Sequence, residues 1–189
     1  MRNPQDLETG SKRAPGDLAF VQGFINTVDV ESGKDAFSTS AGLADWLRHH
    51  GLLATETGVG EKEWEQATGF REGLRSLVLH NNGEEIDRQA LVTLENVAMT
   101  TPLRFHYGEA GDLGLEPHAD DMAGALARLQ AIIYEAMLRG TWVRLKACLC
   151  DTCRWAFYDA SKNRSGSWCS MEVCGNRTKV RKHRQRNTE

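Results

Sequence analysis

All five cysteines of this 189-residue chain lie in one segment near its C-terminal end, between Cys148 and Cys174. Four of them form two pairs, Cys148 with Cys153 and Cys169 with Cys174. Each pair has four residues between its members, and fifteen residues separate the two pairs. Two short loops that each present two thiolates can surround a tetrahedral zinc ion. An odd number of crowded cysteines argues against a secreted disulfide framework and indicates metal binding in the cytoplasm.

The expected metal is a structural zinc ion. Four cysteine ligands fill a tetrahedron, so no position remains for a substrate or an activated water. A segment of about forty residues buries too little apolar surface to fold alone, and metal binding would supply the missing free energy. Cys150 is the spare cysteine in this interpretation, although a Cys150/Cys153 pair also has acceptable spacing. The sequence contains no phosphate-binding glycine loop and no nucleophile elbow, so we expect no enzyme.

Basic residues accumulate around and behind the cysteines. From Arg139 to Glu189 there are twelve Lys and Arg against four Asp and Glu, a net charge of +8. The remainder has eleven basic against twenty-two acidic residues, a net charge of −11. This division indicates a polyanionic partner at one end of the molecule. DNA is the expected partner, and RNA is the alternative because phosphate contacts do not distinguish the two. The basic segment docking on its own acidic body is another interpretation.

Candidate nucleic-acid contacts follow from spacing and side-chain type. Arg177, Arg181 and Arg184 are four and three residues apart, so they share one face of a helix that can follow a phosphate backbone or enter a groove. Neighbouring amide groups add hydrogen-bond donors. The candidates are Asn163, Arg164, Asn176, Arg177, Lys179, Arg181, Lys182, Arg184 and Arg186. Structural roles within the finger are the alternative for Asn176 and Arg177, which lie two and three residues after the predicted ligand Cys174.

Hydrophobic periodicity predicts the elements that position this segment. Helices are expected at about 18–28, 40–51, 61–80, 86–97 and 118–140, the second capped by Ser40. Alternating apolar residues on either side of residues 108–111 predict a β-hairpin. Around the metal we expect a second hairpin and then a helix capped by Ser170, with Cys174 in its first turn.

The expected fold is therefore a mainly α N-terminal domain with one β-hairpin, followed by a small α+β treble-clef-like zinc finger. The domain boundaries are a disordered leader at 1–14, a helical domain at 15–140 and the finger at 141–189. The leader lacks the apolar core of a signal peptide, and no apolar run approaches the roughly 18 residues of a membrane span. We therefore expect a cytoplasmic protein.

Two residues of the helical domain, Asn26 and Trp46, are candidate ligand-pocket residues, although capping and core packing explain them equally. His118 with Asp120 and Asp121 is interpreted as ordinary chemistry of a helix N-terminus. A single finger buries little surface on DNA, so dimerisation or further contacts are expected for specificity.

The segment CRWAFYDASKNRSGSWCSMEVCGNRTKVRKHRQR resembles the CGNR zinc finger, which is named for the tetrapeptide Cys174-Gly175-Asn176-Arg177. The body, with LAFVQGFINTVD near its start and a tryptophan in LADWL, resembles the ABATE domain. The two resemblances imply a bacterial transcription regulator whose four finger cysteines bind zinc. Our leading hypothesis is that the finger binds DNA while the body senses a small molecule or mediates dimerisation. A zinc-stabilised protein-interaction module is the alternative function.

Overall fold

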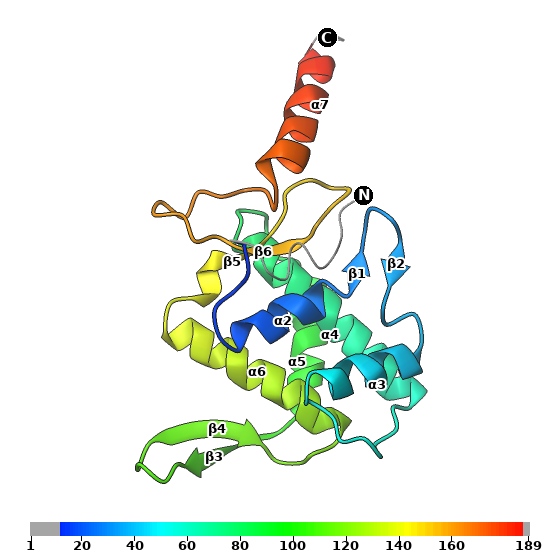
Figure 1. The fold of residues 1–189 in the computed structure, drawn as a ribbon, viewed down its shortest axis with the longest axis vertical. Helices are drawn as coiled ribbons and strands as arrows, with labels where there is room; N and C mark the ends of the chain where they lie inside the picture. Colours follow the sequence, from blue (N-terminus) through cyan, green and yellow to red (C-terminus); the bar gives the residue numbers. More distant parts are fainter. Residues whose placement is uncertain (1–11, 187–189) are drawn as a thin grey trace.

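A computed structural model describes residues 12–186 of the chain, and Figure 1 shows their arrangement. The helices are α2 (Leu18–Ile25), α3 (Ser40–His49), α4 (Glu61–His80), α5 (Arg88–Thr100), α6 (Met122–Leu138) and α7 (Asn176–Arg186). A short 3-10 turn, Trp142–Arg144, follows α6, and a π-helical turn, Met171–Gly175, precedes α7. Most of the predicted leader lies outside the described residues.

Within residues 12–186, six short strands form three separate antiparallel hairpins. They are β1 (Val28–Asp29) with β2 (Lys34–Asp35), β3 (Leu103–Tyr107) with β4 (Leu113–Pro117), and β5 (Leu145–Ala147) with β6 (Ala156–Tyr158). The second and third hairpins are those expected from the sequence. The expected fold class, a mainly helical region followed by a small cysteine-rich α+β unit, is confirmed.

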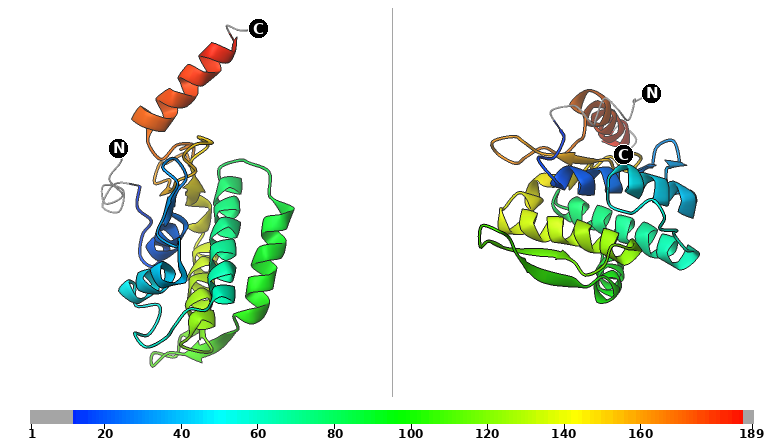
Figure 2. Two further views of the ribbon diagram at one scale, coloured as in Figure 1. Left: turned by 90° about the vertical axis from the view of Figure 1, so that its right-hand side faces the viewer. Right: turned by 60° about the horizontal axis from the view of Figure 1, so that its bottom comes forward.

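The hydrophobic core lies where α2, α4 and α6 pack against one another. Phe24 of α2 is fully buried, with its ring centroid 5.4 Å from that of Phe37 and 6.0 Å from that of Phe70. Helix α5 packs along α4 on the outside of this group (Figure 2). The two helices approach closely at Gly73, where an added Cβ would lie 2.9 Å from the Leu94 side chain.

Several element boundaries differ from the expectation, among them the start of α6 at Met122, and three of the differences have a clear cause. Helix α2 ends at Ile25, and Val28 starts a strand instead, because Asp29 accepts hydrogen bonds from the next turn and Gly33 takes a positive φ of 70°. The cap of α3 is Thr39 rather than Ser40, since its hydroxyl accepts a hydrogen bond from the Gly42 N–H at 3.1 Å. Ile86 precedes α5, which Asp87 caps.

The finger's hairpin shares the core of the helices. Leu145, Ala147 and Ala156 belong to the same buried cluster as α2, α4 and α6. The Asn82 amide donates to the backbone carbonyls of Ala147 and Ser167, at 2.8 and 3.1 Å. The end of α4 is therefore bonded directly to the segment that carries the cysteines.

The start of the described chain is also held in place, although residues 12–14 fall within the predicted leader. The Lys12 carbonyl accepts a hydrogen bond from the Tyr158 N–H at 2.8 Å. The Ala14 N–H donates to the Gln22 side chain at 2.7 Å. Within residues 12–186, no helix is long and apolar enough to cross a bilayer.

Candidate metal centre and nucleic-acid interface

The structure brings the four predicted ligand atoms together. The Sγ atoms of Cys148, Cys153, Cys169 and Cys174 all lie within 4.8 Å of one another, and all four residues are buried. The Sγ of Cys169 lies 3.5 Å from that of Cys153 and 3.9 Å from that of Cys174. Four sulfurs at about 2.3 Å from a tetrahedral zinc ion would be about 3.8 Å apart. The donor set and its size therefore suit a metal ion.

The first cysteine pair lies in the connection between β5 and β6. The Cys148 N–H donates to the Trp155 carbonyl at 2.9 Å, which extends the ladder of the hairpin by one step. A tight turn then returns the chain, with the Cys153 N–H donating to the Cys150 carbonyl at 2.8 Å. Arg154 completes this turn at a positive φ of 50°. The strands thus place Cys148 and Cys153 on one knuckle.

The second pair lies at the start of the C-terminal helix. Ser170 follows Cys169, and its hydroxyl accepts a hydrogen bond from the Val173 N–H at 3.3 Å. It is therefore the helix cap that the sequence predicts. Cys174 lies in the π-helical turn just before α7. A π-helical turn is wider than an α-helical one and is frequent at functional sites.

Cys150 lies beside the group without belonging to it. It is buried, and its Sγ lies 3.5 Å from the Thr152 hydroxyl. The compact group of four Sγ atoms includes Cys148 and leaves Cys150 out. The geometry therefore favours Cys148 over the alternative Cys150/Cys153 pair.

The buried thiols of this group contact one another. Hydrogen bonding with Cys153 and then with Cys169, together with burial, raises the pKa of the Cys148 thiol far above its usual range. A metal ion must therefore displace protons when it binds, and its positive charge compensates the buried thiolates.

A small apolar group supports the cysteines. Phe157 is fully buried against them, and Trp155 and Trp168 are partly buried against the same cluster. These rings form the miniature core of the finger, so they serve packing before any stacking on bases. The cluster of cysteines and rings is separate from the main core, and a metal ion bound by the cysteines would stabilise it.

The two residues directly after Cys174, Gly175 and Asn176, have defined structural positions. An added Cβ at Gly175 would lie 2.5 Å from the Met171 sulfur, so a glycine is needed there. The Asn176 side chain donates to the Glu172 carbonyl at 2.9 Å. Asn176 therefore stabilises the π-helical turn, as its alternative role supposed.

Arg177 reaches across to the helical body. Its Nη2 lies 2.9 Å from Glu31 Oε1 in the β1–β2 turn, and its Nη1 donates to the Thr152 hydroxyl at 3.3 Å. The hydrogen bond and the charge of Glu31 raise the pKa of the guanidinium. One turn further along α7, Arg181 pairs with Asp151 at 2.8 Å. The two arginines share a face, as predicted, and that face meets carboxylates of the same chain.

The β1–β2 hairpin that carries Glu31 is held to helix α4 by a partly buried ion pair. Asp35 accepts two hydrogen bonds from the Arg71 guanidinium, at 2.7 and 2.8 Å. Burial opposes ionisation of Asp35, but bonds from Arg71 and from the Phe37 N–H outweigh it and lower the pKa of the carboxyl. The hairpin that presents Glu31 is therefore fixed to helix α4.

A buried ion pair shapes the turn that presents Asn163 and Arg164. Lys146 Nζ lies 2.9 Å from Asp159 Oδ2, and the two side chains are 6% and 1% exposed. Asp159 also accepts hydrogen bonds from the N–H groups of Ser161 and Gly166. Burial opposes ionisation, but these bonds and the ammonium outweigh it and lower the pKa of Asp159 far below its usual range. Asn163 and Arg164 lie exposed at the tip of the turn.

The remaining candidates follow α7 away from the body, as Figure 1 shows. Lys179 is exposed and, among the residues that the structure describes, makes no ion pair. Lys182, Arg184 and Arg186 lie on the last turns of α7, and their side chains fall outside the described part. The helix thus leaves the metal centre as a basic rod.

Two family models match this chain. A family model described as "Putative stress-induced transcription regulator", ABATE, matches residues 18–140. A second, described as "CGNR zinc finger", matches residues 144–187. The chain belongs to the ABATE family and ends in a CGNR zinc finger. A search of curated proteins found no match.

The two ABATE residues proposed for a ligand pocket, Asn26 and Trp46, contact other parts of the chain. The Asn26 side chain donates to the Ala156 carbonyl at 2.9 Å and accepts from the Ala156 N–H at 2.7 Å, so it binds β6 in the way that a neighbouring strand would. Trp46 stacks on His50, with centroids 3.9 Å apart, and packs against Phe24 and Phe37. Asn26 joins the ABATE domain to the CGNR finger, and Trp46 belongs to the core.

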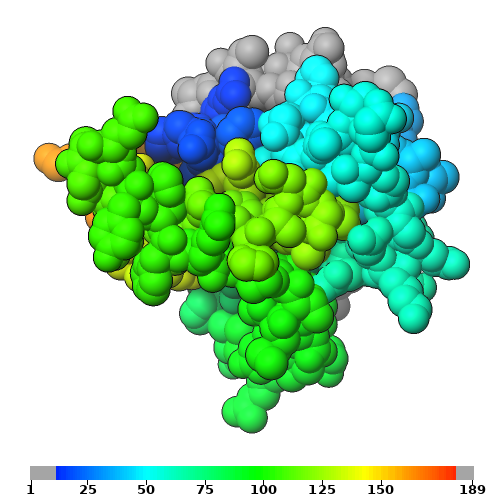
Figure 3. All heavy atoms as spheres, turned by 90° about the horizontal axis from the view of Figure 1, so that it is seen from below, coloured from blue at the N-terminus to red at the C-terminus, as the bar shows by residue number. Residues whose placement is uncertain are grey.

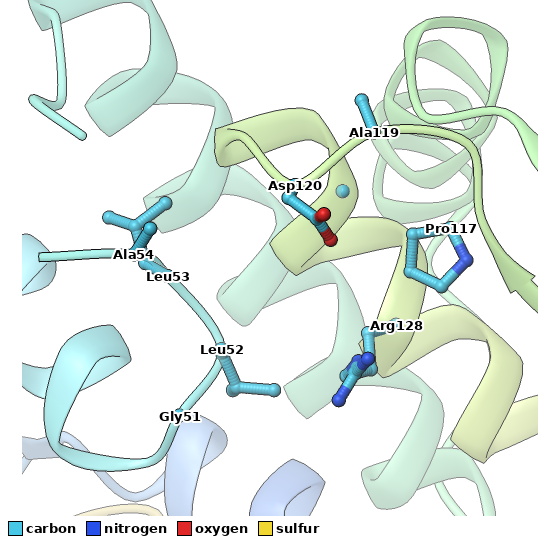
Figure 4. A pocket seen from close by; sticks show the side chains of 9 residues that line it. Gly51, Leu52, Leu53, Ala54, Pro117, Ala119, Asp120 and Arg128 are labelled. Atoms are coloured by element: carbon cyan, nitrogen blue, oxygen red, sulfur yellow. The ribbon is translucent and has the colours of Figure 1, made fainter. Parts of the chain in front are cut away.

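A shallow pocket of about 290 Å³ lies at the end of the ABATE domain remote from the finger (Figure 4). Its lining comes from the segment after α3, the end of β4 and the start of α6. The lining residues are Gly51, Leu52, Leu53, Ala54, Pro117, Ala119, Asp120, Gly124 and Arg128. Asp120 and Arg128 are its charged side chains, and neither Asn26 nor Trp46 belongs to it.

Sequence reasoning missed the contacts that orient the finger. The sequence around Glu31 and Asp159 did not indicate that these residues make ion pairs, because a surface glutamate and a lone aspartate are common. Two neighbouring asparagines, Asn81 and Asn82, directly follow the helix predicted at 61–80. An asparagine pair at the end of an amphipathic helix offers amide donors for a docked backbone, and this was the available signal.

Proposed function

We propose that this protein is a bacterial, cytoplasmic, DNA-binding transcription regulator with a structural zinc ion in its CGNR finger. The observation that carries the proposal is the direct attachment of the basic helix α7 to a compact four-cysteine centre. A positive rod held at its base by metal ligands suits contact with phosphates along a groove. The basic character of the finger contrasts with the acidic body, which disfavours binding through the ABATE domain.

The metal's proposed role is structural, and the protein is proposed to have no catalytic activity. Cys148, Cys153, Cys169 and Cys174 would occupy all four positions of a tetrahedral ion. When bound, zinc would supply cross-linking of the knuckle to the start of α7. The ABATE domain would sense a small molecule, with the pocket of Figure 4 as the candidate site, or mediate dimerisation.

Binding across salt concentrations tests the nucleic-acid proposal. We expect the intact, zinc-loaded protein to bind a mixed-sequence DNA duplex in a mobility-shift assay, with affinity falling steeply as salt rises. Removing two phosphate contacts, in Lys179→Gln combined with Arg164→Gln, should reduce the slope of log affinity against log salt by about two. Absence of binding even at low salt would overturn the proposal.

A matched control separates local contacts from net charge. Lys62→Gln with Arg88→Gln removes the same charge from exposed positions on the ABATE domain, at the starts of α4 and α5. The control should leave the salt slope unchanged. Selection from genomic DNA, run beside Cys153→Ser, would then show whether a zinc-dependent sequence motif is recovered.

The second candidate is a zinc-stabilised module that binds an acidic protein. One observation favours it: Arg177 and Arg181 already pair with carboxylates, those of Glu31 and Asp151. This candidate predicts saturable binding to an acidic partner with no affinity for DNA or RNA at low salt. Comparing DNA and RNA duplexes of one sequence in the same assay distinguishes the nucleic acids.

A further inference from the structure

The hairpin β3–β4 lies on the outside of the ABATE domain with strand β3 outermost (Figure 1). Strand β4 packs along α6, whereas the main neighbour of β3 is β4. Figure 3, seen from below, shows the green hairpin region as part of the surface on this face, beside α6. The hairpin is therefore available to a partner at the end remote from the finger.

The outer edge of β3 carries unpaired backbone groups. The Gly108 N–H donates to the Asp112 carbonyl, and the His118 N–H donates to the Pro102 carbonyl, so even-numbered residues of β3 face β4. Backbone groups in an antiparallel pair alternate in direction, so those of Leu103, Phe105 and Tyr107 point away from β4. In the described part of the chain no strand pairs with this edge.

The same residues expose apolar side chains. Phe105 and Tyr107 are 72% and 74% exposed, and Leu113, opposite Tyr107 on β4, is 56% exposed. Alternate residues of a strand share one face, so these three side chains form one apolar surface with the partly buried Leu115. Open edges of this kind are usually blocked by proline, lysine or a covering element. The edge of β4 has Pro117 and α6, whereas β3 has no such protection over its five residues.

We propose that β3 pairs with β3 of a second copy of this chain, in an antiparallel register centred on Phe105. A two-fold axis at Phe105 would place Phe105 opposite its counterpart and Leu103 opposite Tyr107, so that all five residues of the strand are paired. The two hairpins would then form a four-stranded sheet with Phe105 and Tyr107 of both copies at the centre of one face.

The charges on the opposite face select this register over its neighbours. Arg104 lies 2.7 Å from Glu116, which also lies 3.7 Å from His106, so the positive charge is balanced within each hairpin. The register centred on Phe105 places Arg104 opposite His106. A shift of the pairing toward Leu103 would place Arg104 opposite Arg104, and like charges directly opposite are destabilising. A shift toward Tyr107 would leave Leu103 opposite Glu109.

The area that β3 pairing would bury determines how tightly we expect the dimer to form. A five-residue strand is about 17 Å long, and its pairing buries less than the roughly 1,200–2,000 Å² of a standard interface. We therefore expect an equilibrium between monomer and dimer in the micromolar range. The inference does not rest on nucleic-acid binding, but a dimer would carry two fingers.

Sedimentation equilibrium of the zinc-loaded full chain, without nucleic acid, tests the proposal. We expect a concentration-dependent dimer. Phe105→Lys and, separately, Tyr107→Lys should each raise the dimer dissociation constant about tenfold or more, because they place lysines at the centre of the pairing. Met99→Lys is the matched control: Met99 is 85% exposed at the end of α5, outside β3, and its substitution should leave the dimer intact.

Unfolding midpoints and metal content would show that each variant is folded. If one of the two β3 variants fails to fold, the other still tests the proposal. Four results would overturn the proposal. They are a monomer at all concentrations up to hundreds of micromolar, a dimer unaffected by either β3 variant, a dimer weakened equally by Met99→Lys, and open-ended assembly. A monomer that instead binds extended peptides or lipid vesicles through Phe105 would likewise overturn it.

Discussion

Glu31 of the ABATE domain and Arg177 of the CGNR finger form an ion pair, with 2.9 Å between Oε1 and Nη2. The two residues are 146 positions apart in the sequence. Arg177 is the first arginine of the basic face on α7, and the carboxylate of Glu31 in the same molecule already binds it. A phosphate group that contacts Arg177 must therefore compete with Glu31.

Glu31→Gln should strengthen nucleic-acid binding. The substitution removes the competing carboxylate but keeps a side chain of similar size. Exposed ion pairs contribute about 0.2–1 kcal/mol, so we expect a gain in affinity of about 1.5- to fivefold at moderate salt. Fluorescence anisotropy with a labelled duplex at fixed salt measures the change.

Glu109→Gln is the control for Glu31→Gln, because it removes one exposed negative charge at the β3–β4 turn. Its effect should be smaller than that of Glu31→Gln and should vanish at physiological salt, where the Debye length is about 8 Å. An equal gain in both variants would show that only net charge matters. A loss of affinity in Glu31→Gln would show that the ion pair instead holds Arg177 in its binding position.

Cys148 and Cys150 should differ sharply when each is replaced by serine. Cys148→Ser removes one of the four grouped Sγ atoms, whereas Cys150→Ser alters only a neighbour of Thr152. We expect Cys150→Ser to retain one zinc ion per chain and Cys148→Ser to bind it at least about tenfold more weakly. Native mass spectrometry with a competing chelator measures both. The reverse order would establish the Cys150/Cys153 pair.

Metal removal should loosen the finger and leave the ABATE helices folded. The cysteine cluster with Trp155, Phe157 and Trp168 is separate from the main core, which is built from α2, α4 and α6. A strong chelator should therefore change tryptophan fluorescence while far-UV circular dichroism falls only slightly. Trp155→Phe with Trp168→Phe should abolish most of the fluorescence change. Cooperative loss of all helical signal would instead show that the finger and the core unfold as one unit.

Periodicity and cysteine spacing predicted much of the fold because both depend on short-range relations. The helices around Phe24, Phe70 and Leu126 follow from apolar residues at intervals of three and four. The β3–β4 hairpin follows from alternation around Gly108–Gly111. The cysteine group follows from ligand spacing, since the chain must return to one ion.

Long-range polar contacts could not be predicted in the same way. The bond from Asn26 to Ala156 and the pair between Glu31 and Arg177 each span more than 100 residues, and no local pattern marks their partners. The β1–β2 hairpin has only two residues in each strand, too few for alternation to be visible. Its position depends on the partly buried pair of Asp35 and Arg71, which is a tertiary contact.

Asp159 should be the most costly single polar position in the finger. It is 1% exposed and binds Lys146, which is 6% exposed, so Asp159→Asn leaves a buried ammonium without its carboxylate. Breaking a buried pair from one side costs about 3–5 kcal/mol. Urea unfolding at neutral pH, followed by circular dichroism and tryptophan fluorescence, measures the loss. Asp151→Asn is the control, because Asp151 is half exposed and should cost less than about 1 kcal/mol.

The contribution of Asp159 to the free energy of unfolding should decrease at acidic pH. The pKa of Asp159 is lower in the folded protein than in the unfolded chain, where it is about 3.9. Its contribution to stability is therefore complete above the unfolded value and is lost as the pH falls toward the folded value. Between pH 7 and pH 3 the stability difference between the wild-type protein and Asp159→Asn should thus shrink, measured on both proteins with a matched metal load. A constant difference down to pH 3 would show that Asp159 acts through its hydrogen-bond geometry and not through its charge.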